Sequence, residues 1–291
     1  MRTKFSILFL ALLLPTVAFS QSSYEWLKIA RYKVGNLDPV MKESSGLAFL
    51  NDKLYTLNDG GNPASLYEID PSSAQKRNEI SLPVKNKDWE ALASDSTRLY
   101  IGEFGNNGGT RKDLKIYSVD PREPNKVDSI QYFYPEQKSF SGPLHQHNFD
   151  AESLVFLEGA LHVFTKEFVS QNTTRYQISK DSLIAHQGAK KLETFDIGYM
   201  ATDAAANSDR LFIVGYTWKM EVYLTVFIRD QEGNYFSSRP KKYFLGMCSR
   251  LGQVEGIAVD KDFLYISSEA FNKGPFNALA SLYRVPIEKL N

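Results

Sequence analysis

Five segments of the sequence begin with a residue whose side-chain oxygen could bind a metal ion. These residues are Ser45, Glu90, Glu152, Thr202 and Glu255, and a leucine follows each of them after nine positions. Carboxylate and hydroxyl oxygens are hard ligands, which prefer Ca²⁺ or Mg²⁺ to zinc or copper. If the fold brings the five positions together, the sequence predicts a calcium site, with magnesium as the alternative ion.

Charge repulsion supports a cation at this site. Three carboxylates that share a narrow site without a cation raise one another's pKa values, and no segment has Lys or Arg at the equivalent position. In a second interpretation, the glutamates only accept hydrogen bonds from backbone amides or water at strand ends. Glu43, Asp88 and Asp150, two residues upstream in three segments, could form a second acidic tier or cap turns. Both interpretations stay open.

The five segments are the starts of a sequence repeat. They read Ser45-Gly-Leu-Ala-Phe, Glu90-Ala-Leu-Ala-Ser, Glu152-Ser-Leu-Val-Phe, Thr202-Asp-Ala-Ala-Ala and Glu255-Gly-Ile-Ala-Val. The leucine nine residues later is followed by an aromatic residue or histidine. The starts lie roughly 50 residues apart, a spacing typical of propeller blades. Short apolar runs bounded by Gly, Asn and Asp turns also indicate strands.

The repeat therefore predicts an all-β fold, a single five-bladed β-propeller. Each repeat has four predicted strands except the fifth, which lacks the last one. The segment Leu27–Val34 would supply that strand and close the ring, which leaves no free sheet edge at the join. The innermost strand of each blade lines the channel, so the five oxygen-bearing positions would converge on the axis.

The ring and its blade order resemble the calcium-activated apyrases, secreted nucleoside-diphosphate hydrolases with a five-bladed propeller. In that family an axial Ca²⁺ is held by Ser, Glu, Glu, Ser and Glu in blade order, against Ser45, Glu90, Glu152, Thr202 and Glu255 here. The shared motifs include Lys53-Leu-Tyr, Arg98-Leu-Tyr-Ile-Gly and Val254-Glu-Gly-Ile. Asp88-Trp-Glu-Ala-Leu-Ala and Ile101-Gly-Glu-Phe-Gly-Asn-Asn also resemble exported bacterial propellers of the SdiA-regulated type. The resemblance implies an axial calcium ion and, for the apyrases, phosphoanhydride hydrolysis.

Loops on the predicted face of the ring carry polar residues that could act on a ligand. Asp59 and His147 are candidates for a general base acting on metal-bound water. Cationic side chains in the same loops would suit an anionic substrate; they are Arg111, Lys112, Lys166 and Lys219. Loops carry polar residues in any fold, so the same set is consistent with no catalytic role.

The first twenty residues have the pattern of a signal peptide. Arg2 and Lys4 precede the apolar run Phe5–Leu14, and the small residues Ala18 and Ser20 suit cleavage before Gln21. The apolar run is too short to span a bilayer, although an uncleaved anchor is the alternative. We therefore expect a signal peptide at residues 1–20, a propeller domain at 21–291, and a secreted or periplasmic protein without a transmembrane segment after cleavage.

Composition reduces the number of possible function classes. The chain has 34 basic and 34 acidic residues and therefore no net charge, which gives no indication of a nucleic-acid partner. The single cysteine, Cys248, excludes an intramolecular disulfide; it is either a small buried apolar residue or a nucleophile. Two hypotheses remain. One is a calcium-binding propeller that presents its mouth loops to a small ligand or protein, and the other is a Ca²⁺-dependent hydrolase of phosphoanhydride or ester bonds.

Overall fold

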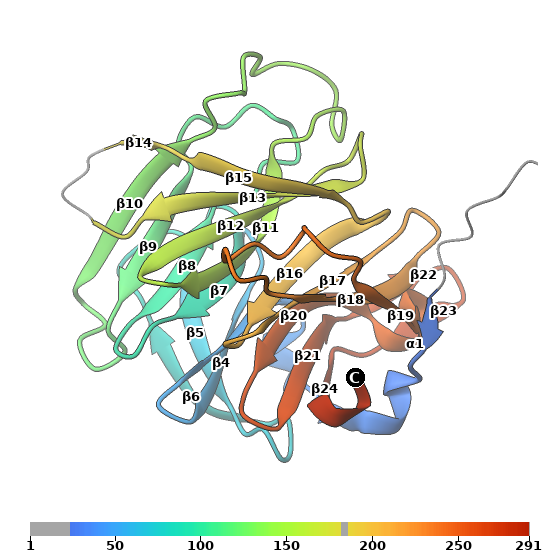
Figure 1. The fold of residues 1–291 in the computed structure, drawn as a ribbon. Coiled ribbons are helices and arrows are strands. Elements are labelled where there is room, and N and C mark those ends of the chain that lie inside the picture. Colours follow the sequence, from blue (N-terminus) through green and yellow to red (C-terminus); the bar gives the residue numbers. More distant parts are fainter. Residues whose placement is uncertain (1–23, 182–185, 291) are drawn as a thin grey trace, which may run out of the picture.

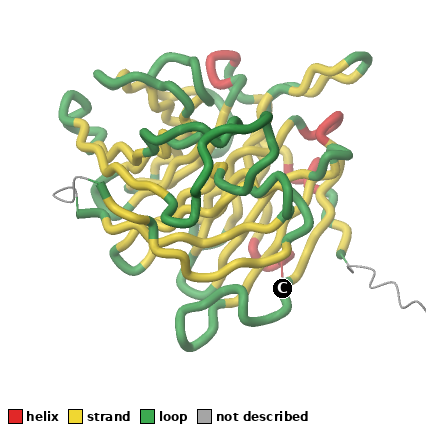
Figure 2. Tube along the Cα trace, turned by 90° about the horizontal axis from the view of Figure 1, so that it is seen from above, coloured by secondary structure: helices red, strands yellow, loops and turns green. Residues whose placement is uncertain are grey.

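The computed structural model describes residues 24–181 and 186–290, which form five antiparallel blades around a common axis (Figure 1). The predicted signal peptide, residues 1–20, lies outside the described residues. Figure 2 shows that strands make up the body of the ring and that the helices are short pieces. None of the helices within the described ranges is long and apolar enough to cross a membrane.

The blades follow the order of the sequence repeat. Blade 1 consists of β3 (Ser44–Leu50), β4 (Lys53–Asn58), β5 (Ser65–Ile69) and β6 (Lys76–Ser81). Blade 2 consists of β7 (Trp89–Ser94), β8 (Leu99–Glu103), β9 (Lys115–Val119), β10 (Val127–Phe133) and β14 (Gln187–Gly188). Blade 3 consists of β11 (Asp150–Leu157), β12 (Ala160–Lys166), β13 (Asn172–Ser179) and β15 (Lys190–Asp196).

The last two blades also take strands from the N-terminal part of the chain. Blade 4 consists of β16 (Met200–Ala206), β17 (Arg210–Tyr216), β18 (Glu221–Ile228), β19 (Lys241–Met247) and β1 (Glu25–Trp26). Blade 5 consists of β20 (Gln253–Val259), β21 (Phe263–Glu269), β24 (Ser281–Pro286) and β2 (Lys33–Asn36). Short elements complete the fold: η1 (Ile29–Tyr32), η2 (Pro39–Met41), α1 (Cys248–Leu251), η3 (Ile287–Leu290) and the hairpin β22 (Phe271–Lys273) and β23 (Phe276–Ala278).

An N-terminal strand closes the ring as the sequence predicts, but this strand begins later in the chain than predicted. β2 pairs antiparallel with β24, so the first and last parts of the chain lie side by side (Figure 1). The predicted closing strand Leu27–Val34 is only partly correct, because Ile29–Tyr32 forms a 3-10 helix and pairing begins at Lys33. β1 adds a parallel strand to blade 4, and β14 adds one to blade 2. Neither addition was predicted, because a two-residue strand carries no periodic signal.

Five apolar clusters hold the ring together, one between each pair of neighbouring blades. The leucine of each Leu-aromatic pair is fully buried in one of them. Trp89 is fully buried between blades 1 and 2. Cys248 is fully buried between blades 4 and 5, and burial raises the pKa of its thiol to about 12. The geometry therefore favours the apolar interpretation of this cysteine over a nucleophile.

His162, on β12, makes the folded protein sensitive to acid. Burial, helped by the nearby charge of Arg175, lowers the pKa of His162 to about 4, against 6.5 for an exposed imidazole. Above pH 6.5 the imidazole is neutral in both states. As the pH falls from 6.5 toward 4, only the unfolded chain takes up the proton, so the free energy of unfolding decreases, by about 3 kcal/mol in total. Urea unfolding between pH 7 and pH 4 measures this decrease.

The matched variant is His162→Gln, which has no titrating group at this position. We expect this variant to lack most of the pH-dependent decrease of about 3 kcal/mol that the native chain shows in its free energy of unfolding. Replacing the exposed His145 by Gln should change the native pH profile far less than replacing His162 does. Identical profiles for the His162 variant and the native chain would contradict the prediction.

Candidate cation site at the channel mouth

Each of the five predicted ring residues lies at a β-bulge of an inner strand. Glu90 has no partner on β8, because Trp89 pairs with Glu103 and Ala91 pairs with Gly102. The register shifts in the same way at Glu152, Thr202 and Glu255, and a wider shift contains Ser45. A bulge re-aims the extra side chain. The repeat therefore carries the same backbone irregularity in all five blades, at one end of the channel, and we name this end the mouth.

The two hydroxyl residues of the ring are joined to neighbouring blades. Ser45 Oγ donates to the backbone carbonyl of Glu90 at 3.1 Å, and Thr202 Oγ1 donates to that of Val254 at 2.6 Å. Both residues are fully buried. Their hydroxyl hydrogens link blade 1 to blade 2 and blade 4 to blade 5, while an oxygen lone pair remains for another contact.

Two of the three ring glutamates have protein partners. Glu152 forms an ion pair with the ammonium group of Lys166. Glu255 Oε1 accepts hydrogen bonds from Tyr216 Oη and Gln253 Nε2, both at 3.1 Å. Lys166 ends β12, beside the inner strand β11, so the cation comes from a position that the ring spacing alone does not show.

Glu90 differs from the other two, because none of the described residues donates a hydrogen bond to its carboxylate, although the residue is only 4% exposed. Asp59, in the loop after β4, and Asp88, just before β7, lie beside it. One carboxylate oxygen from each of Asp59, Asp88 and Glu90 lies within 4.8 Å of the other two. We name these three residues the carboxylate triad.

Burial and mutual repulsion perturb the titration of the triad. Burial, followed by the charge of Glu255, raises the pKa of Asp59 to about 7. Burial and the charge of Glu152 raise the pKa of Glu90 well above its ordinary value, and burial raises that of Asp88. A divalent cation between the three groups would oppose these shifts, because it stabilises the charged form of each carboxylate.

Two glycines leave the space in which the triad assembles. A Cβ atom on Gly105 would overlap Glu90 Oε1 and the carboxyl group of Asp88. A Cβ atom on Gly60 would lie 2.6 Å from Asp88 Oδ1. Hard oxygen donors in a cradle without side chains fit Ca²⁺ or Mg²⁺. Asp88 thus belongs to an acidic tier rather than to a turn cap, whereas Glu43 instead accepts from Asn62 at the loop edge.

Asp203 separates the polar mouth from the rest of the channel. Its fully buried carboxylate accepts hydrogen bonds from Ala204 N at 2.8 Å and Ile257 N at 2.7 Å, and the Leu47 amide also bonds to it. These amides belong to three inner strands, β16, β20 and β3. The carboxylate therefore ties blades 4, 5 and 1 together just below the ring.

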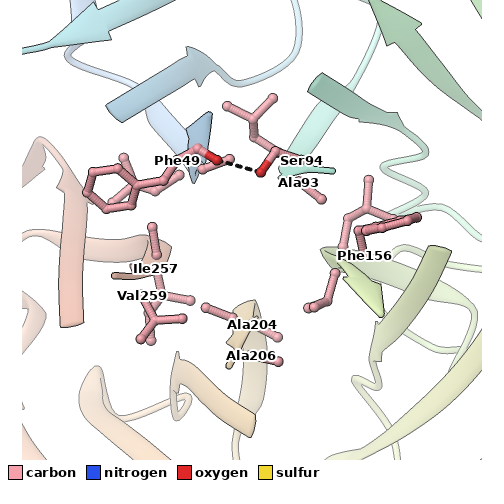
Figure 3. A pocket seen from close by; sticks show the side chains of 15 residues that line it. Phe49, Ala93, Ser94, Phe156, Ala204, Ala206, Ile257 and Val259 are labelled. Atoms are coloured by element: carbon pink, nitrogen blue, oxygen red, sulfur yellow. Dashed lines mark hydrogen bonds between the residues drawn. The ribbon is translucent and has the colours of Figure 1, made fainter. Parts of the chain in front are cut away.

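Beyond Asp203 most of the side chains that line the channel are apolar. The side chains of Phe49, Phe156, Ala204 and Val259 surround a space of about 100 Å³ (Figure 3). Ser94 Oγ donates to the carbonyl oxygen of Phe49 at the edge of this space. The lining offers few polar groups for chemistry, so the mouth is the end of the channel with functional groups.

The structure brings two of the four predicted substrate-binding cations, Arg111 and Lys166, to the mouth. Arg111 is half-buried, pairs with Glu103 at 2.8 Å and Asp113 at 3.0 Å, and lies 4.0 Å from Asp88. Lys112 lies over the ring of Phe140 beside blade 2, and Lys219 is exposed at the β17–β18 turn. Of the four, only Lys166 contacts a ring residue.

The two candidate bases also differ in their surroundings. Both ring nitrogens of His147 are occupied: Nδ1 accepts from Phe149 N, and Nε2 lies 3.1 Å from the carbonyl oxygen of Asn107. This leaves no free nitrogen for a proton transfer in the observed geometry. Asp59 belongs to the carboxylate triad.

An aromatic surface that the sequence did not predict borders the mouth. The ring centres of His145 and Phe168 lie 4.4 Å apart, and Trp218 lies 6.0 Å from both. Trp218 is 51% exposed. The Lys166 ammonium lies 5.5 Å from the ring centre of Phe168, which connects this aromatic rim to Glu152. Exposed Leu144 and Val169 extend the apolar surface, which is typical of an interaction site.

Comparison with known proteins supports the architecture. No family model matches the chain, and no curated protein matches its sequence. Among solved structures, the chain is similar to a Thermus thermophilus protein described as a "putative oxidoreductase (glucose dehydrogenase)". The TM-score is 0.50 at 12% identity, covering 87% of this chain and 98% of that one. A second similar structure is that of YjhT, with a TM-score of 0.46 at 15% identity over 83% of this chain and 76% of that one.

At such identities the first similarity concerns the fold alone. It agrees with the β-propeller architecture and does not bear on the apyrase or SdiA-regulated resemblance, which stays a prediction.

Proposed function

We propose that this protein is an exported binding propeller whose mouth holds a divalent cation, Ca²⁺ in the first place and Mg²⁺ as the alternative. The observation that carries the proposal is the carboxylate of Glu90. It is 4% exposed, it has no hydrogen-bond donor among the described residues, and it faces Asp59 and Asp88 within 4.8 Å. Burial of an unpartnered carboxylate is costly, and a cation between Glu90 and the half-buried Asp59 and Asp88 is a partner that the three groups would share.

The aromatic rim supports a binding role for the mouth. The exposed rings of His145 and Trp218 pack against the buried Phe168, whose ring centre lies 5.5 Å from the ammonium group of Lys166. A small molecule or a protein segment could pack on these rings while its polar groups reach the cation. The signal-peptide pattern of residues 1–20 supports export. A calcium site is consistent with an exported protein.

Both nitrogens of the predicted base His147 are occupied and the aromatic rim favours a binding role, so a binding function is the one we propose. The test is thermal melting of residues 21–291, first in EDTA and then in Ca²⁺. A ligand that binds only the folded state adds about 2.7 kcal/mol at 100 times its Kd. We expect a Ca²⁺-dependent rise of the melting temperature and no phosphate release from nucleoside di- or triphosphates. No shift with Ca²⁺ or Mg²⁺ would contradict the cation site, and phosphate release would contradict the binding role.

A further inference from the structure

Lys166 occupies an unusual position for a lysine at the mouth of a channel. Its side chain is 8% exposed, and its ammonium group is ion-paired with Glu152, whose side chain is 7% exposed. The ammonium also lies 5.5 Å from the ring centre of Phe168 and 5.7 Å from that of Tyr216. The ion pair with Glu152 and the two flanking aromatic rings hold the ammonium in place as a fixed positive charge.

The mouth holds many more negative than positive groups. The carboxylates that face one another there are Asp59, Asp88, Glu90, Asp150, Glu152, Glu255 and Glu269. Among the described residues, the half-buried Arg111 and the buried Lys166 oppose them. Arg111 is held by Glu103 and Asp113 and approaches the triad only through Asp88, at 4.0 Å. Lys166 is the cation that contacts a ring carboxylate directly.

We propose that Lys166 is a built-in counter-ion that competes with a divalent cation for Glu152 and thereby sets the affinity of the mouth. The inference rests on the proposed function, because it concerns the same cation site. The ammonium is held where it satisfies Glu152 and repels a second cation. An incoming ion must bind the triad against that charge, or displace the ammonium from Glu152 toward Phe168 and recruit Glu152 as a further ligand.

The consequence is a site that is weaker than its carboxylates alone would make it. Removal of this positive charge from the mouth should tighten the binding of a divalent ion by about tenfold or more, even with strong dielectric screening. The gain should depend on Glu152, since this is the carboxylate that the substitution sets free.

Isothermal titration of Ca²⁺ into residues 21–291 tests the proposal. We compare the native chain with Lys166→Met and with the control Lys219→Met, which removes an exposed lysine of the same charge at the β17–β18 turn. We expect a Kd at least about tenfold lower for Lys166→Met and an unchanged Kd for Lys219→Met. The double variant Glu152→Gln, Lys166→Met should lose most of the gain. Should Lys166→Met not fold, Lys166→Gln replaces it, because the amide still donates a hydrogen bond to Glu152.

The outcomes separate the two proposals. If the native chain binds Ca²⁺ and the neutral Lys166 variants bind no more tightly, the counter-ion role is overturned and the proposed cation site stands. If the neutral variants bind and the native chain does not, Lys166 is a competitor and the proposed function of the native chain is overturned. If none of the chains binds, both proposals fail. An equal gain in Lys219→Met would also overturn the inference, because any nearby positive charge would then suffice.

Discussion

Replacement of Glu90 by Gln should weaken Ca²⁺ binding by about 100-fold while making the cation-free protein more stable. The loss of affinity follows from the removal of one negative charge from direct contact with the ion. The gain in stability follows from the burial of Glu90 without a hydrogen-bond donor, since a neutral amide costs less to bury than a carboxylate. We expect about 1–3 kcal/mol in the free energy of unfolding. Calcium titration and urea unfolding in EDTA measure the two effects.

A matched control is Glu68→Gln on β5. Glu68 is about as buried as Glu90, but its carboxylate accepts from Lys53 at 3.0 Å, away from the mouth. Its substitution should leave Ca²⁺ binding unchanged and should not stabilise the protein. If Glu90→Gln destabilises the cation-free chain and leaves calcium affinity unchanged, Glu90 is a structural residue and the carboxylate triad is not a metal site.

Replacement of Asp203 by Ala should lower the free energy of unfolding by about 3 kcal/mol or more. The substitution leaves the Ala204 and Ile257 amides without their acceptor in a region from which water is excluded. Each buried amide that loses its partner costs about 1–3 kcal/mol, and more where the lost acceptor is charged. Urea unfolding of the native and variant chains in the same buffer measures the difference.

Two variants show whether the effect comes from the hydrogen bonds. Asp203→Asn keeps one acceptor oxygen, so its stability should lie between those of the native chain and Asp203→Ala. Asp209→Ala, in the exposed turn before β17, should change the free energy of unfolding by less than about 0.5 kcal/mol. A loss below about 1 kcal/mol for Asp203→Ala would mean that the carboxylate does not tie the inner strands together.

The sequence by itself determined the blades and the inner-strand positions of the ring residues. Short apolar runs bounded by turn residues mark the strands, and the same nine-residue spacing recurs from Ser45 to Glu255, so local pattern is enough to place each ring residue on an inner strand. The closing strand was predicted for the same reason, although its bounds were wrong by several residues because the 3-10 turn Ile29–Tyr32 interrupts the predicted strand.

Only the tertiary structure decided which of these residues meet. Lys166 reaches Glu152 from the neighbouring strand β12, and Asp59 reaches Glu90 from a loop of another blade. The amides that bind Asp203 come from three blades. The bulges that aim the ring side chains, and the approach of loops across the mouth, depend on how five separately patterned sheets pack around one axis. A local sequence pattern does not determine the distances between residues of different blades. The carboxylate triad and its lysine counter-ion could therefore be identified only from the closed ring.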